Sequence, residues 1–168
     1  YAPRFIQRRI ATRIATWGKR ACRALGMDTV HQQAAAEAEV VRLFDALEAQ
    51  LGLTPFAMGH GPTAVDATLL GGLRAHFLSD PVPQRLLASY PRILTWAEHA
   101  SAEPRRGTLP CFPQTTAFGR FILREFAGAY TTMLLGNASA LESAQKSFTA
   151  EVYAAPQSYL TRPYPERS

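Results

Sequence analysis

The sequence has 168 residues, of which 47% are hydrophobic and 18% charged, a composition that excludes a disordered or fibrous chain. No stretch approaches the roughly 18 uninterrupted apolar residues that a membrane-spanning helix needs. The net charge of +5 is unevenly placed, because the first 27 residues hold seven basic side chains and no acidic one.

The basic N-terminal segment is predicted to form one amphipathic helix that ends near Gly26. Ile6, Ile10, Ile14 and Trp17 recur at intervals of three and four residues, so they share one third of a helical wheel, opposite the basic residues. Such a helix can contact nucleic acid or an anionic membrane. We expect neither partner. Aromatic side chains do not interleave with the basic ones for base stacking, and the apolar stripe suits burial in a helical bundle.

A second helix is predicted over residues 31–51, followed by a glycine-containing loop. The stretch from Thr63 to Asp66 is then predicted to start a third helix. The Thr63 hydroxyl can cap this helix, and the Asp66 carboxylate can accept a hydrogen bond from the Thr63 amide. This is a capping box with aspartate in the place usually taken by glutamate or glutamine. We assign both residues a structural role.

The third helix is predicted to carry its apolar face as far as Phe77. A short helix is expected within residues 80–91, and a further helix is expected to begin at Pro91, where proline is well tolerated. Residues 101–114 contain several prolines and a glycine. They are therefore predicted to form a loop or a short linker.

The last part of the chain is predicted to be helical and then extended. An aromatic stripe from Phe118 to Leu134 indicates a long helix that ends near Gly136, and residues 138–148 are predicted to form a further short helix. Residues 152–168 are rich in proline and tyrosine and are expected to be extended. Since no segment alternates convincingly as a strand, the predicted fold class is all-α, a helical bundle.

No pattern of cysteine or histidine indicates a metal site or a nucleophile. Cys22 and Cys111 are the only cysteines and lack CxxC spacing, and the four histidines lack the i, i+4 spacing of a helical metal site. These histidines are His31, His60, His76 and His99. We therefore predict no metal site and no catalytic cysteine, and we expect a reduced, cytoplasmic protein.

Several motifs in a fixed order resemble the C-terminal helical domain of the glutathione transferase superfamily, in its bacterial-type branch. As they stand in this sequence, they are Leu51-Gly52, Pro55-Phe56, Gly59, Pro62-Thr63, Asp66, Tyr90-Pro91 and Trp96. Residue 93 is isoleucine where leucine is commoner in the family. The likeness is good over residues 35–100 and less specific elsewhere. It implies a glutathione transferase C-terminal-like bundle, with its core in residues 1–103 and a helical extension in residues 104–168.

The resemblance also implies what this chain would do. In the family, a preceding thioredoxin-like domain binds the co-substrate glutathione and supplies the residue that activates its thiol. Nothing of that pattern occurs in these residues, and both ends of the sequence look cut. We therefore expect that domain, with the unknown catalytic residue, to lie before Tyr1. This chain would shape the pocket for a small hydrophobic electrophile, and a homodimer would be the usual assembly.

In the family, the first and last helices of the helical domain wall the second-substrate pocket. The corresponding candidates here are Phe5, Trp17, Phe118, Phe121, Tyr130 and Met133. For each of them, ordinary packing in the bundle core is the alternative role. The rival function is a non-catalytic, glutathione transferase-like structural module that uses the same surfaces for protein contacts. A thioredoxin-like sequence upstream would distinguish the two.

Overall fold

The computed structural model describes residues 3–24, 27, 29–100, 116–152 and 155–163. This part of the chain is mostly helical and contains a two-stranded sheet, so the fold belongs to the mainly α class. The chain divides into two compact units, residues 39–125 and residues 1–38 together with 126–168. The predicted domain boundary after residue 103 and the predicted loop at 101–114 lie outside the described residues.

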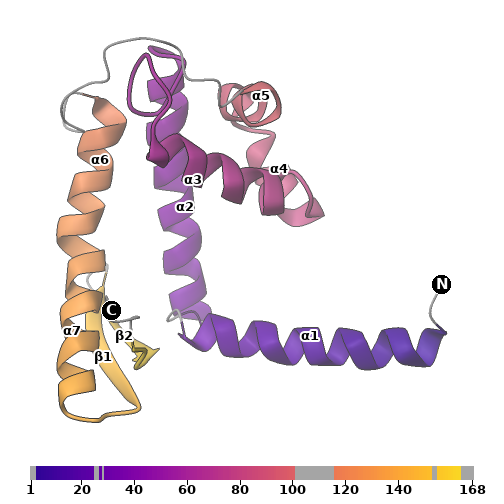
Figure 1. The fold of residues 1–168 in the computed structure, drawn as a ribbon, viewed down its shortest axis with the longest axis vertical. Helices are drawn as coiled ribbons and strands as arrows, with labels where there is room; N and C mark the ends of the chain where they lie inside the picture. The colour runs from indigo at the N-terminus through magenta and orange to yellow at the C-terminus, as the bar shows by residue number, and fades with distance from the viewer. Residues whose placement is uncertain (1–2, 25–26, 28, 101–115, 153–154, 164–168) are drawn as a thin grey trace. The chain divides into compact units, whose positions relative to one another are not determined.

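The helices and strands are labelled in Figure 1. The helices are α1 (Arg4–Ala24), α2 (Val30–Leu51), α3 (Ala64–Gly72), α4 (Pro81–Leu87), α5 (Pro91–His99), α6 (Ala117–Glu125) and α7 (Thr131–Glu142). Two π-helical turns, η1 (Leu73–Phe77) and η3 (Phe126–Tyr130), follow α3 and α6 without a break. The strands are β1 (Ser147–Val152) and β2 (Ala155–Leu160). The helices predicted at the N-terminus, over 31–51, after Thr63, within 80–91 and from Pro91 are confirmed.

Helix α2 begins with a capping box that was not predicted. The Thr29 amide donates to Gln32 Oε1 at 2.9 Å, and the Gln32 amide donates to Thr29 Oγ1 at 3.2 Å. These bonds satisfy two amides that a helix start leaves without intrahelical partners. The threonine and glutamine three residues apart were the available signal. The helix begins at Val30, one residue earlier than predicted.

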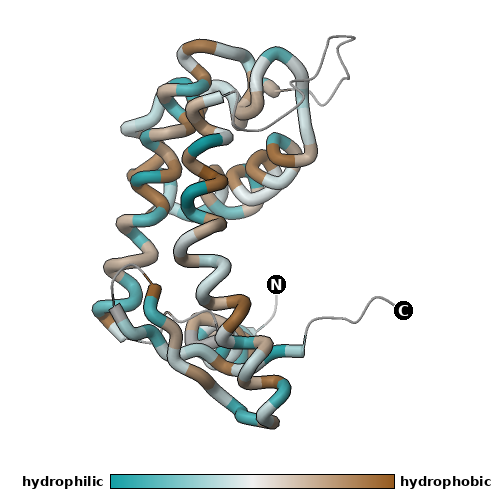
Figure 2. The backbone as a smooth tube through the Cα atoms, turned by 90° about the vertical axis from the view of Figure 1, so that its left-hand side faces the viewer, coloured by the Kyte–Doolittle hydropathy of each residue, from teal (hydrophilic) through white to brown (hydrophobic). Residues whose placement is uncertain are grey.

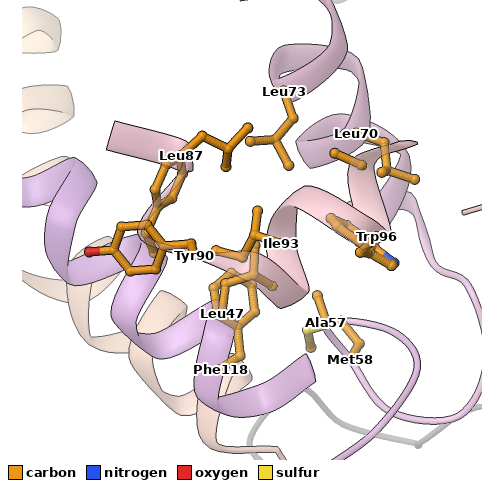
Figure 3. Packing of buried hydrophobic residues seen from close by; sticks show 12 residues of the cluster. Leu47, Ala57, Met58, Leu70, Leu73, Leu87, Tyr90, Ile93, Trp96 and Phe118 are labelled. Carbon is orange, nitrogen blue, oxygen red and sulfur yellow. The ribbon is translucent and has the colours of Figure 1, made fainter. Parts of the chain in front are cut away.

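The unit of residues 39–125 is organised around one hydrophobic core, shown in Figure 3. Side chains from α2, α3, α4, α5 and α6, and from the loop before α3, point toward one another there. Leu47 and Ile93 are completely buried at its centre, and the Phe44 ring lies against Tyr90 with ring centroids 5.2 Å apart. The apolar stripes predicted for the second and third helices therefore form this core.

In the other unit, helix α7 packs against the antiparallel hairpin of β1 and β2, and the two lie side by side in Figure 1. Ala150 and Tyr159 are buried in the hairpin, and Met133 of α7 packs against them. The prediction of a separate short helix over residues 138–148 is wrong. Helix α7 continues to Glu142, and β1 begins at Ser147.

Gly136 explains part of the difference between the predicted and the observed helix end, because it lies within α7 rather than at its end. A Cβ atom built on Gly136 would lie 2.9 Å from Cδ2 and Cε2 of the Phe148 ring, so only glycine leaves space for that ring. The strand was hard to predict because just three residues alternate on its apolar side. They are Phe148, Ala150 and Val152, and one of them is a small alanine.

Candidate functional site

Asp66, in the first turn of α3, is 1% exposed and accepts three hydrogen bonds. Its Oδ1 atom accepts from the Ala57 amide at 2.8 Å, and Oδ2 accepts from the amide and the hydroxyl of Thr63 at 2.8 and 2.7 Å. A capping box thus joins Thr63 and Asp66. The bond to Ala57 has a further effect, because it ties the preceding loop to the first turn of the helix.

That loop, residues 52–63, is also closed on itself. Phe56 and Gly59 exchange two backbone hydrogen bonds, with N···O distances of 3.1 and 3.2 Å. Gly59 has a φ of 128°, a conformation that glycine adopts without the steric penalty a side chain would bring. Phe56, Ala57 and Met58 are buried. The loop is therefore a folded part of the core rather than a surface connection.

Gln50 connects this loop to α6. Its buried side chain accepts from the Phe118 amide at 3.3 Å through Oε1 and donates to Thr54 Oγ1 at 2.9 Å through Nε2. The Thr54 hydroxyl in turn donates to the Phe56 carbonyl at 2.8 Å. Because the Phe118 amide belongs to the first turn of α6, Gln50 satisfies a donor that the helix itself cannot pair.

Helix α5 is held at both ends by side chains from other elements. At its start, the Glu48 carboxylate of α2 accepts from the amides of residues 92 and 93 at 3.1 and 3.0 Å. At its end, Arg74 of η1 donates through Nε and Nη2 to the carbonyls of Ala97 and Ala100, both at 2.7 Å. A negative group at the N-terminus and a positive group at the C-terminus both stabilise the helix, because each interacts favourably with the helix dipole.

Tyr90, immediately before α5, provides a further link to α2. Its hydroxyl donates to Asp45 Oδ1 at 2.9 Å. Burial raises the pKa of the Tyr90 phenol above its usual value of 10.0, and the hydrogen bond to Asp45 and the charges of Asp45 and Glu48 act in the same direction. The phenol therefore keeps its proton and its role as a donor.

An open pocket of about 570 Å³ lies beside α5, and its lining includes Pro55, Phe56, Thr95, Trp96 and His99. Trp96 is 8% exposed, and its buried Nε1 atom has no hydrogen-bond partner in the part of the chain that the structure describes. The volume lies in the range of about 300–1,000 Å³ that is usual for small-molecule sites. The six residues predicted to wall a pocket are not among the described residues that line this one.

The structure does not gather those six residues in one place. Phe118 is completely buried and stacks on Phe121, with ring centroids 6.2 Å apart, in the core of residues 39–125. Met133 belongs to the other unit and packs against the hairpin. Tyr130 is exposed beside Phe126 in that same unit. Core packing and pocket walls both use aromatic residues at helical spacing, so the pattern could not separate the two roles.

The remaining two, Phe5 and Trp17, lie on α1, whose apolar face is exposed. Trp17 is 73% exposed and Phe5 65%. This corrects the expectation that the apolar stripe of the first helix is buried in a bundle. Within the described residues, α1 contacts β2, but that contact leaves the stripe open to solvent.

The cysteine and histidine residues that the structure describes are all exposed. His31, His60, His76 and His99 are all exposed, and so is Cys22, which is a free thiol. Cys111 lies outside the described residues. In the part of the chain that the structure describes, no group of three or more potential metal ligands occurs.

Three polar residues that hold α5, α6 and the loop before α3 in place were not predicted from the sequence: Glu48, Gln50 and Arg74. Gln50 lies at the edge of the apolar stripe of α2, and a polar residue at such a position was the one available signal for it. Glu48 and Arg74 carry no comparable signal. Their partners are backbone groups of α5, which are distant in sequence and have no residue-specific pattern.

Comparison of this chain with protein-family models, with curated proteins and with solved structures returned no match. None of the helices that the structure describes is long and apolar enough to cross a membrane. The sequence motifs and the contacts among them are therefore the features of this chain that point to a function.

Proposed function

We propose that this chain is the helical, second-substrate half of a glutathione transferase-like protein. The supporting observation is the set of contacts around Asp66, because the motifs that carry the resemblance meet in one unit. The loop closed at Gly59 is tied to Asp66, and Tyr90 and Trp96 belong to the same core as that loop.

In such a protein, the thiolate of glutathione attacks an electrophilic carbon, and a sulfur–carbon bond forms as the leaving group departs with its electron pair. The thiolate requires a hydrogen-bond donor or a positive charge beside the sulfur. The proposal assigns that group to a thioredoxin-like domain before this chain. The helical half contributes apolar surface for the electrophile, and no residue of this chain is given a catalytic role.

Tyr130 is the wall candidate that fits this role best, since it is exposed and lies beside a second aromatic ring, that of Phe126. Phe118 and Phe121 contribute packing, because Phe118 is completely buried behind Phe121. Phe5 and Trp17 on α1 are not needed for the proposed function.

The test is the intact mass of the natural protein, purified from its own source, followed by an activity assay. A mass well above 18.5 kDa, with a thioredoxin-like sequence before Tyr1, supports the proposal. That protein should then conjugate glutathione to a chloronitroaromatic electrophile, with release of chloride. Replacing Tyr130 by alanine should raise KM for the electrophile more than KM for glutathione.

A mass near 18.5 kDa would overturn the proposal, because the chain would then lack the domain that holds glutathione. The same conclusion would follow if the larger protein neither bound immobilised glutathione nor formed the conjugate. The non-catalytic interaction module would then be the better account of the fold.

A further inference from the structure

We propose that α1 binds the surface of anionic lipid membranes, lying in the plane of the interface with its basic side chains toward the phosphates. The observation behind this proposal is that both faces of the helix are open. One face carries the basic side chains, and the opposite face is apolar and uncovered. The inference goes beyond the proposed function and does not depend on it.

The basic face carries charge that nothing in α1 neutralises. Its exposed members are Arg4, Arg8, Arg9, Arg13, Lys19 and Arg20. No acidic residue occurs in α1, and no ion pair among the described residues involves it. A surface of this kind attracts an anionic partner, and the attraction weakens as salt is added.

The apolar face is formed by Ile6, Ile10, Ile14 and Trp17, opposite the basic half. All four are exposed, and Ile14 is 62% exposed. Figure 2 colours the backbone of the described residues by hydropathy. An aligned row of apolar side chains in water is unfavourable and marks a contact surface. Tryptophan in particular suits a membrane interface, because its ring is apolar and its N–H is polar.

The two faces together favour a lipid surface over other anionic partners. Helix α1 has 21 residues, which corresponds to a length of about 30 Å. A bilayer surface presents phosphates directly above acyl chains over any such length, so it satisfies both faces at once. Nucleic acid offers the phosphates but no apolar layer for the isoleucines. A helix with this charged face and exposed apolar stripe lies on a membrane rather than across it.

The expectation that α1 avoids membranes depended on its apolar stripe being buried inside the bundle. The exposure of Ile10, Ile14 and Trp17 removes that reason. The contrast with α2 is direct, since Phe44 and Leu47 of α2 follow the same spacing and are buried in the core.

The first experiment is co-sedimentation of the 168-residue chain with vesicles of phosphatidylcholine, with and without about one third phosphatidylserine. We expect binding to the anionic vesicles, weakened by salt, and at least about tenfold weaker binding to the neutral ones. The fluorescence of Trp17 should shift to shorter wavelength on binding. Trp96 is buried in the core, so the Trp17→Phe variant should lose the shift while it still sediments with the anionic vesicles.

Two double variants separate the contributions of the faces. Arg8→Gln with Arg9→Gln should weaken binding by about fivefold for each charge removed. Ile10→Ser with Ile14→Ser should weaken it by about tenfold while it leaves the thermal melt unchanged, since both side chains are exposed. Val82→Ser is the matched control, because Val82 is equally exposed but belongs to α4, and it should bind like the parent.

Three results would overturn the proposal. The first is equal binding, or none, to anionic and neutral vesicles. The second is binding that responds to the arginine changes but not to the isoleucine changes, with duplex DNA competing equally, because a polyanion would then be the partner. The third is a lipid-free dimer that Ile10→Ser with Ile14→Ser dissociates, because a second copy of the chain would then cover the apolar face.

Discussion

Helices α1 and α2 have nearly the same length, 21 and 22 residues, and both repeat apolar side chains at intervals of three and four. In α2 the repeat is covered, because Phe44 and Leu47 meet side chains from α3, α4, α5 and α6 in one core. In α1 the repeat is open, with Ile14 and Trp17 largely exposed. Periodicity therefore shows which face of a helix can be covered, but not whether anything covers it.

The polar residues of α1 and α2 also differ in whether they contact other parts of the fold. Glu48 and Gln50 of α2 each satisfy backbone amides at the start of another helix, α5 and α6 respectively. The described arginine side chains of α1 are exposed: Arg4, Arg8, Arg9, Arg13 and Arg20. A polar residue near a covered stripe thus becomes part of the fold, whereas a polar residue on an open helix stays available for an external partner.

The largest expected effect comes from Leu47, which is completely buried. Leu47→Ala should lower the free energy of unfolding by about 2–5 kcal/mol, because it removes buried methyl groups and leaves a cavity. The matched change on the open helix, Ile14→Ala, should cost less than about 0.5 kcal/mol. Denaturant unfolding of the two variants measures both values. Equal losses would mean that the stripe of α1 is covered after all.

A somewhat smaller loss is expected from Asp66→Ala. The change leaves the amide of Ala57 and the polar groups of Thr63 without their acceptor inside the fold, so stability should fall by about 2–3 kcal/mol. Asp80→Ala is the control, because Asp80 also lies at a helix start, as the N-cap residue of α4, but is exposed and makes no side-chain cap. Thermal melts of both variants test this, and an Asp66→Ala variant that melts like its parent would contradict the structural role.

Gly136→Ala tests how closely α7 packs against the hairpin. The new Cβ would meet the Phe148 ring at 2.9 Å, so we expect a net loss of about 1 kcal/mol despite the better helix propensity of alanine. Gly128→Ala, in η3, meets no atom within 4 Å and should leave stability unchanged or raise it by up to about 1 kcal/mol. Urea unfolding of the pair decides the sign, and a stabilised Gly136→Ala variant would contradict the close packing.

The last expected effect concerns Tyr90 and appears in the pH dependence of the free energy of unfolding. The pKa of the Tyr90 phenol in the folded chain is raised above 10.0, so the phenol of the unfolded chain loses its proton at a lower pH. The contribution of the Tyr90 phenol to stability is therefore complete below the unfolded-state pKa of 10.0. It is then lost as pH rises through the folded-state pKa. Tyr90→Phe should cost about 1 kcal/mol at neutral pH and should flatten the alkaline decline. Unfolding measured between about pH 7 and pH 11 tests this, and an unchanged slope would contradict it.

Much of the fold was predictable because it depends on neighbours in sequence. The starts of α3 and α5 follow from Thr63 with Asp66 and from Pro91, and the stripe of α2 follows from its apolar spacing. The errors come from contacts between elements, which the local sequence does not show. Gly136 reads as a helix end, but the ring that needs its space lies in another element.

The candidate site was less predictable than the fold. The capping residues Thr63 and Asp66 have a sequence signature, but the bond from Ala57 to Asp66 does not. The aromatic residues selected as pocket walls share one pattern and yet have different environments. Phe118 is buried in the core, whereas Trp17 is exposed on α1.

Local sequence was sufficient for the helical class, the helix starts, the basic face of α1 and the box at Thr63 and Asp66. These features depend on dihedral preferences, on hydrogen bonds over three or four residues, and on helical periodicity. Long-range packing settled the rest. It brought Glu48 and Arg74 to the two ends of α5 and left the apolar stripe of α1 uncovered. Burial and helix capping from a distance depend on which surfaces meet, and that is a property of the folded chain.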